Sequence, residues 1–316
     1  MSGQLSQKVT MVKRWGKILA GKTEVAVRQG PGRCYVRGEI AGYYNDLTGK
    51  VSPNTLLDGS GIPLSVISGG VKVHFPIAIF QYALGSYDLS LLNADSASSH
   101  RASFQSCARW ALRTQREDGS WDTFGPLGSK AYTVSSMAQG EGCSVLLRAY
   151  RAFGDEAYLN GALRASDFML HSLEEGGVAV YDGKALYLEE YPQVPRRSVL
   201  NGWIFSIFGL IDAALVSERY AASLEQTLDT LEMVLSSYDT GYWTYYDLSG
   251  RIASPAYHAL HIAQLEVLAD VTGRDVFRRW ANRFNEYESS ATCRRWAVAK
   301  KVVQKLTEKS DAVVVQ

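Results

Sequence analysis

The chain has 316 residues, of which 46% are hydrophobic, so it can bury a sizeable core in one large domain with an appendage, and it is not a disordered protein. With 33 basic and 32 acidic residues the formal net charge is +1, so no global field attracts nucleic acid or a membrane surface, and a polyanion must be held by a local patch. No apolar run is long enough for a membrane span or a signal peptide, so we expect a cytoplasmic location.

The cysteines and the short motifs give no indication of a cofactor. Cys34, Cys107, Cys143 and Cys293 lie far apart and form no CxxC pair, so neither a zinc site nor a disulfide framework is indicated, and a reducing compartment agrees with this pattern. No G-x-G-x-x-G motif follows a predicted strand. We therefore expect neither a metal nor another cofactor.

Residues 1–75 are expected to form a small N-terminal region of strands and loops. Val25 and Val27 stand at alternate positions, 34–36 is short and strand-like, and glycine and proline interrupt the segment repeatedly. After this region apolar residues recur at helical spacings. The expected domains are therefore 1–75, the strand and loop region, and 76–316, a helical catalytic domain.

Helical periodicity dominates the second region, and the predicted helices come in pairs with short links. They run over 142–153 with 156–173, 199–216 with 220–235, 257–271 with 276–287, and finally 291–306. Successive hairpins of this kind, with long polar loops at the opposite end, predict a mainly α fold: an α/α barrel, or toroid, with β-hairpin insertions on the rim that the long loops share.

Three long loops are predicted on that rim, at 118–135, 174–197 and 237–256. The second has strand-like runs on both sides of a turn, the first contains Trp121, and the third is rich in aromatic residues. Aromatic faces pack on the C–H-rich faces of sugar rings, so the rim indicates a carbohydrate site with Trp121 as a substrate contact.

The densest polar cluster, residues 187–203, combines acids, arginines and a tyrosine between the expected hairpin and a helix. Pro192 and Pro195 keep the backbone extended, and Ser198 is the expected N-cap of the apolar helix that follows. The cluster therefore lies in a loop at the mouth of a buried helix, where functional residues are common.

Several segments in register carry a resemblance to a known family. They are Glu189-Glu190-Tyr191-Pro192, Ser198-Val199-Leu200-Asn201-Gly202, Tyr245-Tyr246-Asp247-Leu248, Tyr257-His258-Ala259-Leu260-His261 and the earlier Ser136-Met137-Ala138-Gln139-Gly140. In order and spacing the chain resembles the C-terminal domain of heparosan (D-glucuronyl) C5-epimerases over roughly residues 40–290. An arginine that follows Tyr-Asp-Leu in that family is Ser249 here, with Arg251 two positions later.

The resemblance implies an isomerase that inverts C5 of D-glucuronate to L-iduronate in a heparosan-like or heparan sulfate-like polysaccharide, without a cofactor. The family's catalytic tyrosines fall on Tyr191, Tyr246 and Tyr257, its acidic neighbour on Glu190 and its asparagine on Asn201. The expected partner is then an acidic polysaccharide, with no nucleic acid and no membrane, and a homodimer is left open.

The chemistry needs such residues, because the carbanion at C5 must delocalise into a carboxylate that is already negative. Cationic donors aimed at that carboxylate stabilise the enediolate, so Arg196, Arg197 and Arg251 are expected substrate contacts, as are His261 and Gln139. Inversion also needs a base on one face of the ring and an acid on the other. Tyrosine can serve in either role if nearby cations lower its pKa from about 10.

Other interpretations of the same residues stay open. Adjacent acids such as Glu189 and Glu190 are also typical of a solvated turn, or could be the acid and nucleophile of a hydrolase. Asn201 could simply cap or bridge loops. A uronate polysaccharide lyase begins with the same proton abstraction and then expels the group at C4. A toroid glycoside hydrolase would need a well-placed acid pair, and a non-catalytic glycan-binding module would keep the aromatic rim without opposed tyrosines.

Overall fold

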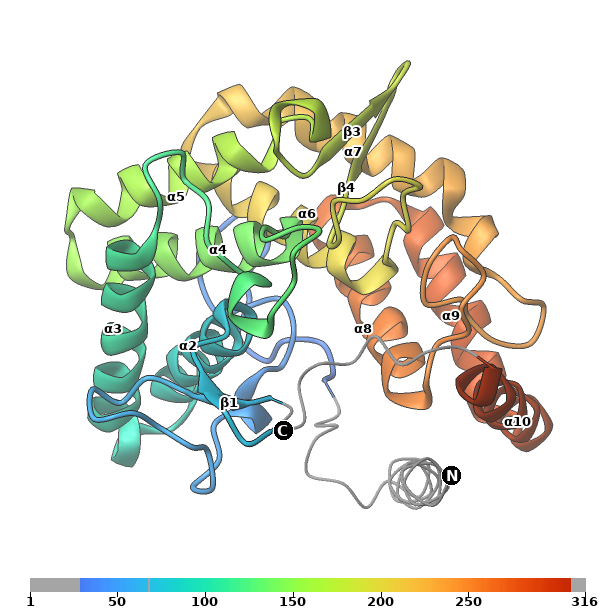
Figure 1. Cartoon of the computed structure of the whole chain (residues 1–316), viewed down its shortest axis with the longest axis horizontal. Helices are drawn as coiled ribbons and strands as arrows, with labels where there is room; N and C mark the ends of the chain where they lie inside the picture. The colour runs from blue at the N-terminus through green and yellow to red at the C-terminus, as the bar shows by residue number, and fades with distance from the viewer. Residues whose placement is uncertain (1–28, 68, 308–316) are drawn as a thin grey trace.

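The computed structural model describes residues 29–67 and 69–307, and they form a mainly helical protein (Figure 1). The helices are α2 (Pro76–Leu92), α3 (Ala97–Thr114), α4 (Ser136–Phe153), α5 (Glu156–Met169), α6 (Leu200–Val216), α7 (Ala221–Val234), α8 (Pro255–Thr272), α9 (Asp275–Ser289) and α10 (Ala291–Thr307). Two antiparallel hairpins accompany them, β1 (Ser65–Val66) with β2 (Lys72–Val73) and β3 (Ala179–Asp182) with β4 (Ala185–Leu188).

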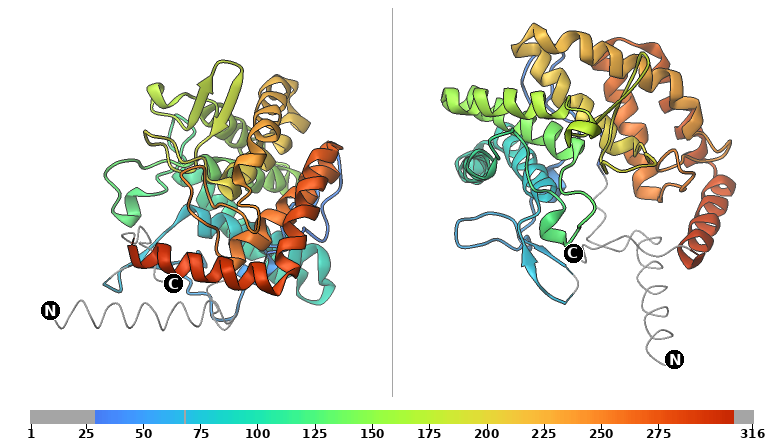
Figure 2. Two further views of the ribbon diagram at one scale, coloured as in Figure 1. Left: turned by 90° about the vertical axis from the view of Figure 1, so that its right-hand side faces the viewer. Right: turned by 45° about the horizontal axis from the view of Figure 1, so that its top comes forward.

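The helices form two rows. Consecutive helices pack as hairpins, α2 with α3, α4 with α5 and α8 with α9, while α4 also packs against both α2 and α6. Figure 1 shows them along an arc, from α2 and α3 through α4 to α7 and on to α8 and α9. The inner row is α2, α4, α6 and α8. This confirms the predicted α/α toroid arrangement, and Figure 2 shows α10 at the end of the arc, beside α9.

The two rows differ in their hydrophobic pattern. Helix α6 is buried continuously from Leu200 to Leu210, as expected for a helix covered on all sides. Helix α9 buries only Phe277, Ala281 and Phe284, which lie three or four residues apart on one face. The sequence therefore distinguishes an inner helix from an outer one by how much of its circumference is apolar.

Two glycines let α4 and α6 approach each other closely. A Cβ atom at Gly140 would lie 2.6 Å from the carbonyl oxygen of Phe205, and one at Gly209 would lie 2.3 Å from the Cα of Gly140. Both distances are shorter than real contacts of a Cβ atom. The backbones of the two helices are therefore in contact at this point, in the centre of the inner row.

The described part of the N-terminal region is tied to the inner helices. The buried Arg148 of α4 donates to the carbonyl oxygen of Gly42 at 3.0 Å, and Tyr44 donates to Asp212 of α6 at 2.8 Å. The expected strand at 34–36 is reduced to an isolated bridge from Val36 to its neighbour Glu39. The domain boundary at residue 75 stays a prediction, and the expected strand at Val25 and Val27 lies outside the described residues.

The hairpin β3–β4 projects beyond the helices in Figure 1, as expected for an insertion on the rim. Its register pairs Ala179 with Leu188, and Gly183 adopts a positive φ of 60° in the turn. The hairpin is anchored on α7, where the hydroxyl of Thr230 accepts the N–H of Leu186 at 2.8 Å. No helix within the described residues is both long and apolar enough to cross a membrane.

Candidate functional site

Glu189 fixes the loop that follows β4. Its buried carboxylate accepts the N–H of Ser198 at 2.8 Å and the hydroxyl of the same residue, which adopts a φ of 45°. A positive φ is uncommon outside glycine, so these two hydrogen bonds hold an otherwise unfavourable turn. Helix α6 begins at Leu200 with Val199 as its N-cap. The prediction that Ser198 caps this helix is therefore wrong, because Glu189 binds its hydroxyl.

Glu190 lies beside the first turn of α6, and only 5% of it is exposed. A Cβ atom at Gly202 would lie 2.3 Å from its Oε2, so the carboxylate occupies the space that a larger residue would fill. Within the described residues Oε2 has no hydrogen-bond partner. Burial raises the pKa of Glu190 to about 7, although contact with the Tyr191 hydroxyl and the charge of Arg251 lower it. Glu190 is thus the member of this cluster whose pKa lies nearest to neutral pH.

Tyr191 lies among aromatic side chains of the 118–135 loop. Its ring is stacked on Phe124 with centroids 5.1 Å apart, and Tyr132 meets it edge-on at 5.7 Å. Burial and then the negative charge of Glu190 raise the pKa of Tyr191 well above its ordinary value. Tyr191 is therefore a neutral phenol beside a carboxylate.

Tyr246 and Tyr257 form a second aromatic pair, with ring centroids 4.8 Å apart and an angle of 64° between the planes. Tyr257 stands in the first turn of α8, where Pro255 follows the N-cap Ser254, whose hydroxyl accepts the N–H of Tyr257. Tyr246 comes from the loop before that helix. Tyr257 as a whole residue is 41% exposed, so this pair reaches the protein surface.

The pKa values of this second pair are also raised. Burial and then the charge of Glu190 raise the pKa of Tyr257 to about 12 and that of Tyr246 well above its ordinary value. Arg251 lowers the pKa of Tyr246 but is outweighed by burial. Nearby cations therefore do not bring the pKa of these tyrosines below its ordinary value, and the pKa close to neutral pH belongs to Glu190.

The structure brings the four predicted catalytic residues together. Tyr191 follows the hairpin, Tyr246 comes from the 239–252 loop and Tyr257 from α8, yet the charge of Glu190 acts on the hydroxyls of all three. Tyr191 packs on the 118–135 loop, while Tyr246 and Tyr257 pack on each other. The cluster thus draws its phenol groups from separate elements of the chain.

Arg251 is held beside this cluster by Asp247, a residue that the sequence did not single out as functional. The buried Asp247 accepts the Nε–H of Arg251 at 2.6 Å, and the guanidinium lies 5.4 Å from the ring centre of Tyr246. Ser249 donates its hydroxyl to Asp247 at 2.7 Å. Asp247 therefore orients Arg251, and Ser249 orients Asp247.

The other two predicted arginines lie elsewhere on the same loop. The guanidinium of Arg196 lies 4.0 Å from the ring centre of Tyr187 and 3.3 Å from the carboxylate of Asp182, so it packs on the hairpin. The carbonyl oxygen of Arg197 accepts the N–H of Leu248, which joins two of the loops. Their contacts with a substrate stay predictions.

Trp121 and Gln139 are part of the core, and the prediction that they contact substrate needs correction. Trp121 is 1% exposed and donates its indole N–H to the carbonyl oxygen of Ala111. Gln139, which is fully buried, donates to the carbonyl oxygen of Gly119 at 3.0 Å and accepts the N–H of Trp121. Both side chains are used in hydrogen bonds to backbone groups of the 118–135 loop and its surroundings, so we do not include them in the site.

The aromatic residues of that loop that do reach the site are Phe124 and Tyr132, which the sequence analysis did not select. Both were within the loop predicted to carry sugar-binding aromatics. Their contact with Tyr191 depends on how the loop folds over the hairpin, which no local pattern specifies. Only their residue type could have suggested them.

His258 and His261 are buried below Tyr257 and share the hydroxyl of Thr244. His258 Nε2 lies 3.0 Å from the carbonyl oxygen of Phe284, so this nitrogen carries the proton and its Nδ1 accepts the hydroxyl of Thr244 at 2.9 Å. Thr244 must then accept the Nδ1–H of His261 at 3.1 Å. Burial lowers the pKa of His258 to about 4 and that of His261 well below its ordinary value.

His261 is therefore neutral, and its Nε2 is a buried lone pair without a hydrogen-bond partner among the described residues. Asn201 lies close to α8, because its backbone carbonyl oxygen accepts a hydrogen bond from the side-chain amide of Gln264. Gln264 is one helical turn after His261. Contact of His261 and Asn201 with substrate stays a prediction. Within residues 29–67 and 69–307, no three His, Cys, Asp or Glu side chains gather in a group that could hold a metal ion.

Comparisons with known proteins show what the chain is similar to. A family model described as D-glucuronyl C5-epimerase C-terminus matches residues 123–286. The D-glucuronyl C5-epimerase of Caenorhabditis elegans is 30% identical over 216 residues, which are 60% of this chain and 35% of that protein. An uncharacterized protein of Methanocaldococcus jannaschii is 31% identical over 152 residues, 46% of this chain and 49% of that protein.

The chain thus spans between about a third and a half of the length of these two relatives. Among solved structures, a variant titled UGL with dGlcA-Glc-Rha-Glc aligns with 76% of this chain and 64% of its own. The TM-score is 0.43 and the sequence identity 17%.

Proposed function

Since the chain belongs to the family described as D-glucuronyl C5-epimerase C-terminus, we propose that it is an isomerase that inverts C5 of D-glucuronate within an acidic polysaccharide. The observation that carries the proposal is the convergence of Tyr191, Tyr246 and Tyr257 around the buried Glu190. A reaction that removes a proton from one face of a ring and adds one to the other needs an acid and a base on opposite faces, and these three hydroxyls, carried by separate elements, are our candidates.

The raised pKa values suggest how the protons move. Tyr191 takes the C5 proton of the substrate while its own hydroxyl proton passes to Glu190, which is the group titrating near neutral pH. The electron pair left at C5 delocalises into the substrate carboxylate. The hydroxyl of Tyr257 or Tyr246 then donates a proton to the opposite face of C5. The starting state returns when the resulting tyrosinate gains a proton from solvent at the exposed Tyr257 and Glu190 releases the proton that it took from Tyr191.

The charge that develops on the substrate carboxylate requires a cation, and Arg251 is placed for this role. It is the guanidinium next to Tyr246, and Asp247 holds it in one orientation. A preorganised cation stabilises the enediolate more than the ground state, because the charge grows during the reaction.

Replacement of Arg251 by alanine is expected to lower kcat/KM by about 10²-fold or more, mainly through kcat. Arg196→Ala is the matched control, because Arg196 packs on Tyr187, and we expect it to change KM only modestly. Arg251→Lys should recover part of the loss. Steady-state kinetics of the three variants test this, and an equal rise in KM alone for Arg251→Ala and Arg196→Ala would reassign both arginines to general attraction of the polymer.

The activity is expected to depend on pH through Glu190, whose ionised form must accept the Tyr191 proton. With a pKa of about 7, kcat/KM should rise up to about pH 7 and then level off, and Glu190→Gln should abolish this limb along with most of the activity. A pH profile of kcat/KM for both proteins checks this. A profile that keeps the same limb in Glu190→Gln would exclude Glu190 as its source.

The same pKa makes a prediction about stability. Burial raises the pKa of Glu190 above the ordinary 4.5, so between these values the folded state keeps a proton that the unfolded state has lost, and stability falls as the pH rises through that range. Glu190→Gln should therefore raise the midpoint of urea unfolding near pH 8 and leave it almost unchanged near pH 4. This measurement does not depend on any activity.

Product analysis tests the proposed reaction. Incubation with a glucuronate polymer should yield iduronate without shortening the chains. New 4,5-unsaturated ends with ultraviolet absorbance would show a uronate lyase instead, which shares the first proton abstraction, and new saturated reducing ends would show a hydrolase. Binding of the polymer with no chemical change would leave a glycan-binding module.

The narrower expectations belong to the same proposal. The substrate would be a heparosan-like polymer that contains glucuronate, and heparan sulfate-type chains with iduronate its product class. All four cysteines are free thiols, which supports the expected cytoplasmic location. Whether the chain forms a homodimer stays open.

A further inference from the structure

Helix α10, at the end of the arc (Figure 2), lies beyond residues 123–286, which the family model matches. It packs against α9 and also contacts the 239–252 loop. That loop carries Tyr246 and Arg251, two residues of the proposed active site. The contacts between α10 and the loop therefore connect this helix to the site.

Two side chains of α10 hold both backbone polar groups of Ile252. The side-chain Oε1 of Gln304 accepts the N–H of Ile252 at 3.1 Å, and the ammonium group of Lys301 donates to its carbonyl oxygen. Lys301 and Gln304 are three residues apart, so they lie on one face of the helix. Only 9% of Lys301 is exposed, and burying its charge is costly unless the ammonium group is hydrogen-bonded. Helix α10 therefore binds the loop at a defined point.

A small hydrophobic cluster, separate from the main core, lies at the same contact. Its buried members are Trp243, Ile252 and Ala253, from the segment before α8, and Ala297 of α10. Tyr246 is partly buried and packs against this cluster. The support beneath Tyr246 therefore includes a residue of α10.

Ile252 is directly linked to both site residues of the loop. It forms an isolated β-bridge with Tyr245, the neighbour of Tyr246. The residue before it is Arg251, whose carbonyl oxygen accepts the N–H of Tyr246. A displacement of Ile252 would therefore move the backbone that carries the guanidinium and the phenol. A misplacement of about 1 Å in a reacting group can lower a rate by about 10²-fold, so the position of Ile252 matters to catalysis.

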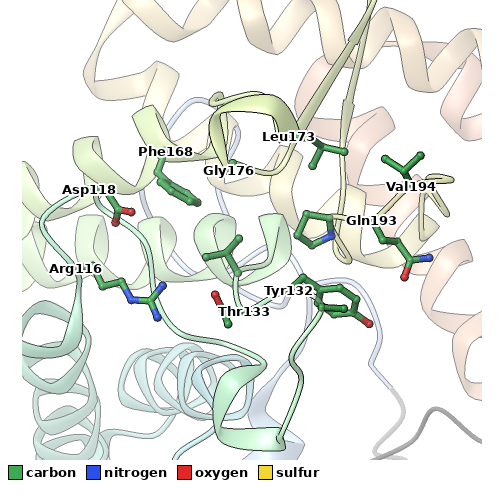
Figure 3. A pocket seen from close by; sticks show the side chains of 13 residues that line it. Arg116, Asp118, Tyr132, Thr133, Phe168, Leu173, Gly176, Gln193 and Val194 are labelled. Atoms are coloured by element: carbon green, nitrogen blue, oxygen red, sulfur yellow. The ribbon is translucent and has the colours of Figure 1, made fainter.

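The pocket beside Tyr191 is built from other parts of the chain (Figure 3). Tyr132, which packs against Tyr191, lines this pocket, as do Arg116 and Val194. Among the described residues that line it, none belongs to α10 or to the 239–252 loop. Loss of the α10 contacts would therefore leave the walls of this pocket unchanged.

We infer that α10 is a positioning helix for the proposed active site, in which Lys301 and Gln304 hold Tyr246 and Arg251 in place through Ile252. The inference rests on the proposed function, because it concerns the geometry of the tyrosine cluster. Neither side chain needs to touch the substrate. Their loss should lower kcat and leave KM nearly unchanged, because the reacting groups are misplaced while the rest of the site is intact.

Four single variants test this. Lys301→Met removes the ammonium group and keeps a side chain of similar length, and Gln304→Leu removes the acceptor. Each should lower kcat for C5 hydrogen exchange by about 10-fold or more and change KM by about 2-fold or less. Gln304→Glu keeps an oxygen that can accept the N–H of Ile252, so it should keep most of the activity. The control is Lys300→Met, the same substitution at the next residue, which is exposed and lies over the ring of Trp296, and it should keep the wild-type kcat.

A double variant separates positioning from stability. Arg251→Ala removes one of the two groups that α10 is inferred to position. Adding Lys301→Met to it should therefore lower kcat by about 3-fold or less, compared with about 10-fold in the wild-type background. A general loss of stability would lower the rate by the same factor in both backgrounds, and that result would overturn the inference.

Amide hydrogen exchange tests the contact without any activity. In Lys301→Met and Gln304→Leu, peptides from 239–252 should exchange about 10-fold or more faster than in the wild type, while peptides from α6 keep their rate. Lys300→Met should change neither.

Unchanged amide exchange in 239–252, wild-type kcat in both α10 variants, or a loss of kcat that Lys300→Met shares would overturn the inference and leave the proposed function intact. If the wild type exchanges the C5 hydrogen of no uronate polymer, the proposed function fails. Faster amide exchange of the loop in the two variants then still supports the hold of α10 on it, and unchanged exchange overturns it.

Discussion

Tyr191→Phe, Tyr246→Phe and Tyr257→Phe are each expected to lower the rate of C5 inversion by about 10² to 10⁴-fold, the range that a positioned proton transfer supplies. Each substitution removes one hydroxyl and keeps the ring, so the stacking of Tyr191 on Phe124 and the contact between Tyr246 and Tyr257 are preserved. The free energy of unfolding should therefore change by about 1 kcal/mol or less. Kinetics and urea unfolding of the same samples separate the two effects.

The control for these variants is Tyr150→Phe, whose hydroxyl donates to Glu156 on the surface, and it should keep the activity of the wild type. The variants should also differ in the direction of epimerisation that they impair, because the hydroxyl that is the acid when one epimer reacts is the base when the other reacts. At least one should still exchange the C5 hydrogen of a single epimer. If all three turn over at nearly the wild-type rate on both epimers, the tyrosine mechanism is wrong, and Glu189 and Glu190 become the next candidates.

The second large effect concerns stability. Asp212→Ala is expected to lower the free energy of unfolding by about 3–5 kcal/mol, because it leaves the fully buried Arg148 without its counterion. Asp212 also accepts the hydroxyls of Tyr44 and Ser144, at 2.8 and 2.6 Å, and both would lose their partner. Urea unfolding at neutral pH measures the loss.

Asp167→Ala is the matched control, because it breaks an ion pair with Arg219 in which both side chains are about half exposed. Its cost should be only about 0–1 kcal/mol. The network around Asp212 joins α4, α6 and residues 42–44, so both the wild type and the variant should unfold in one transition. A loss below about 1 kcal/mol in Asp212→Ala, or a separate transition of the N-terminal region, would show that the network does not join these parts.

The fold could be predicted from the sequence where the signal is local and repeated. The helix pairs and the hairpin around Gly183 follow from periodicity and turn residues, and the structure places them where expected. Helix starts were predicted less well. Ser198, for example, donates hydrogen bonds to the carboxylate of Glu189 and does not cap the N-terminus of α6. A residue with two possible partners is assigned only by the tertiary contacts, which the local pattern does not contain.

The site shows the same limit. The catalytic candidates were identified as motifs, but their electrostatics depend on burial, so the raised pKa values of Tyr246 and Tyr257 could not be inferred from nearby arginines. Trp121 was expected on the rim because it lies in a polar loop, yet its indole N–H pairs with α3 in the core. Asp247 belongs to the Tyr-Asp-Leu segment but was given no role in the site, and it gains one only because Arg251 folds back onto it.

The most direct test of the central claim is a single incubation of the protein with a glucuronate polymer in heavy water, followed by NMR of the polymer. Inversion through proton removal and return predicts deuterium at C5 of the uronate and the appearance of iduronate signals, with the chain length unchanged. Iduronate that retains hydrogen at C5, or a polymer with neither deuterium at C5 nor iduronate, would contradict the account.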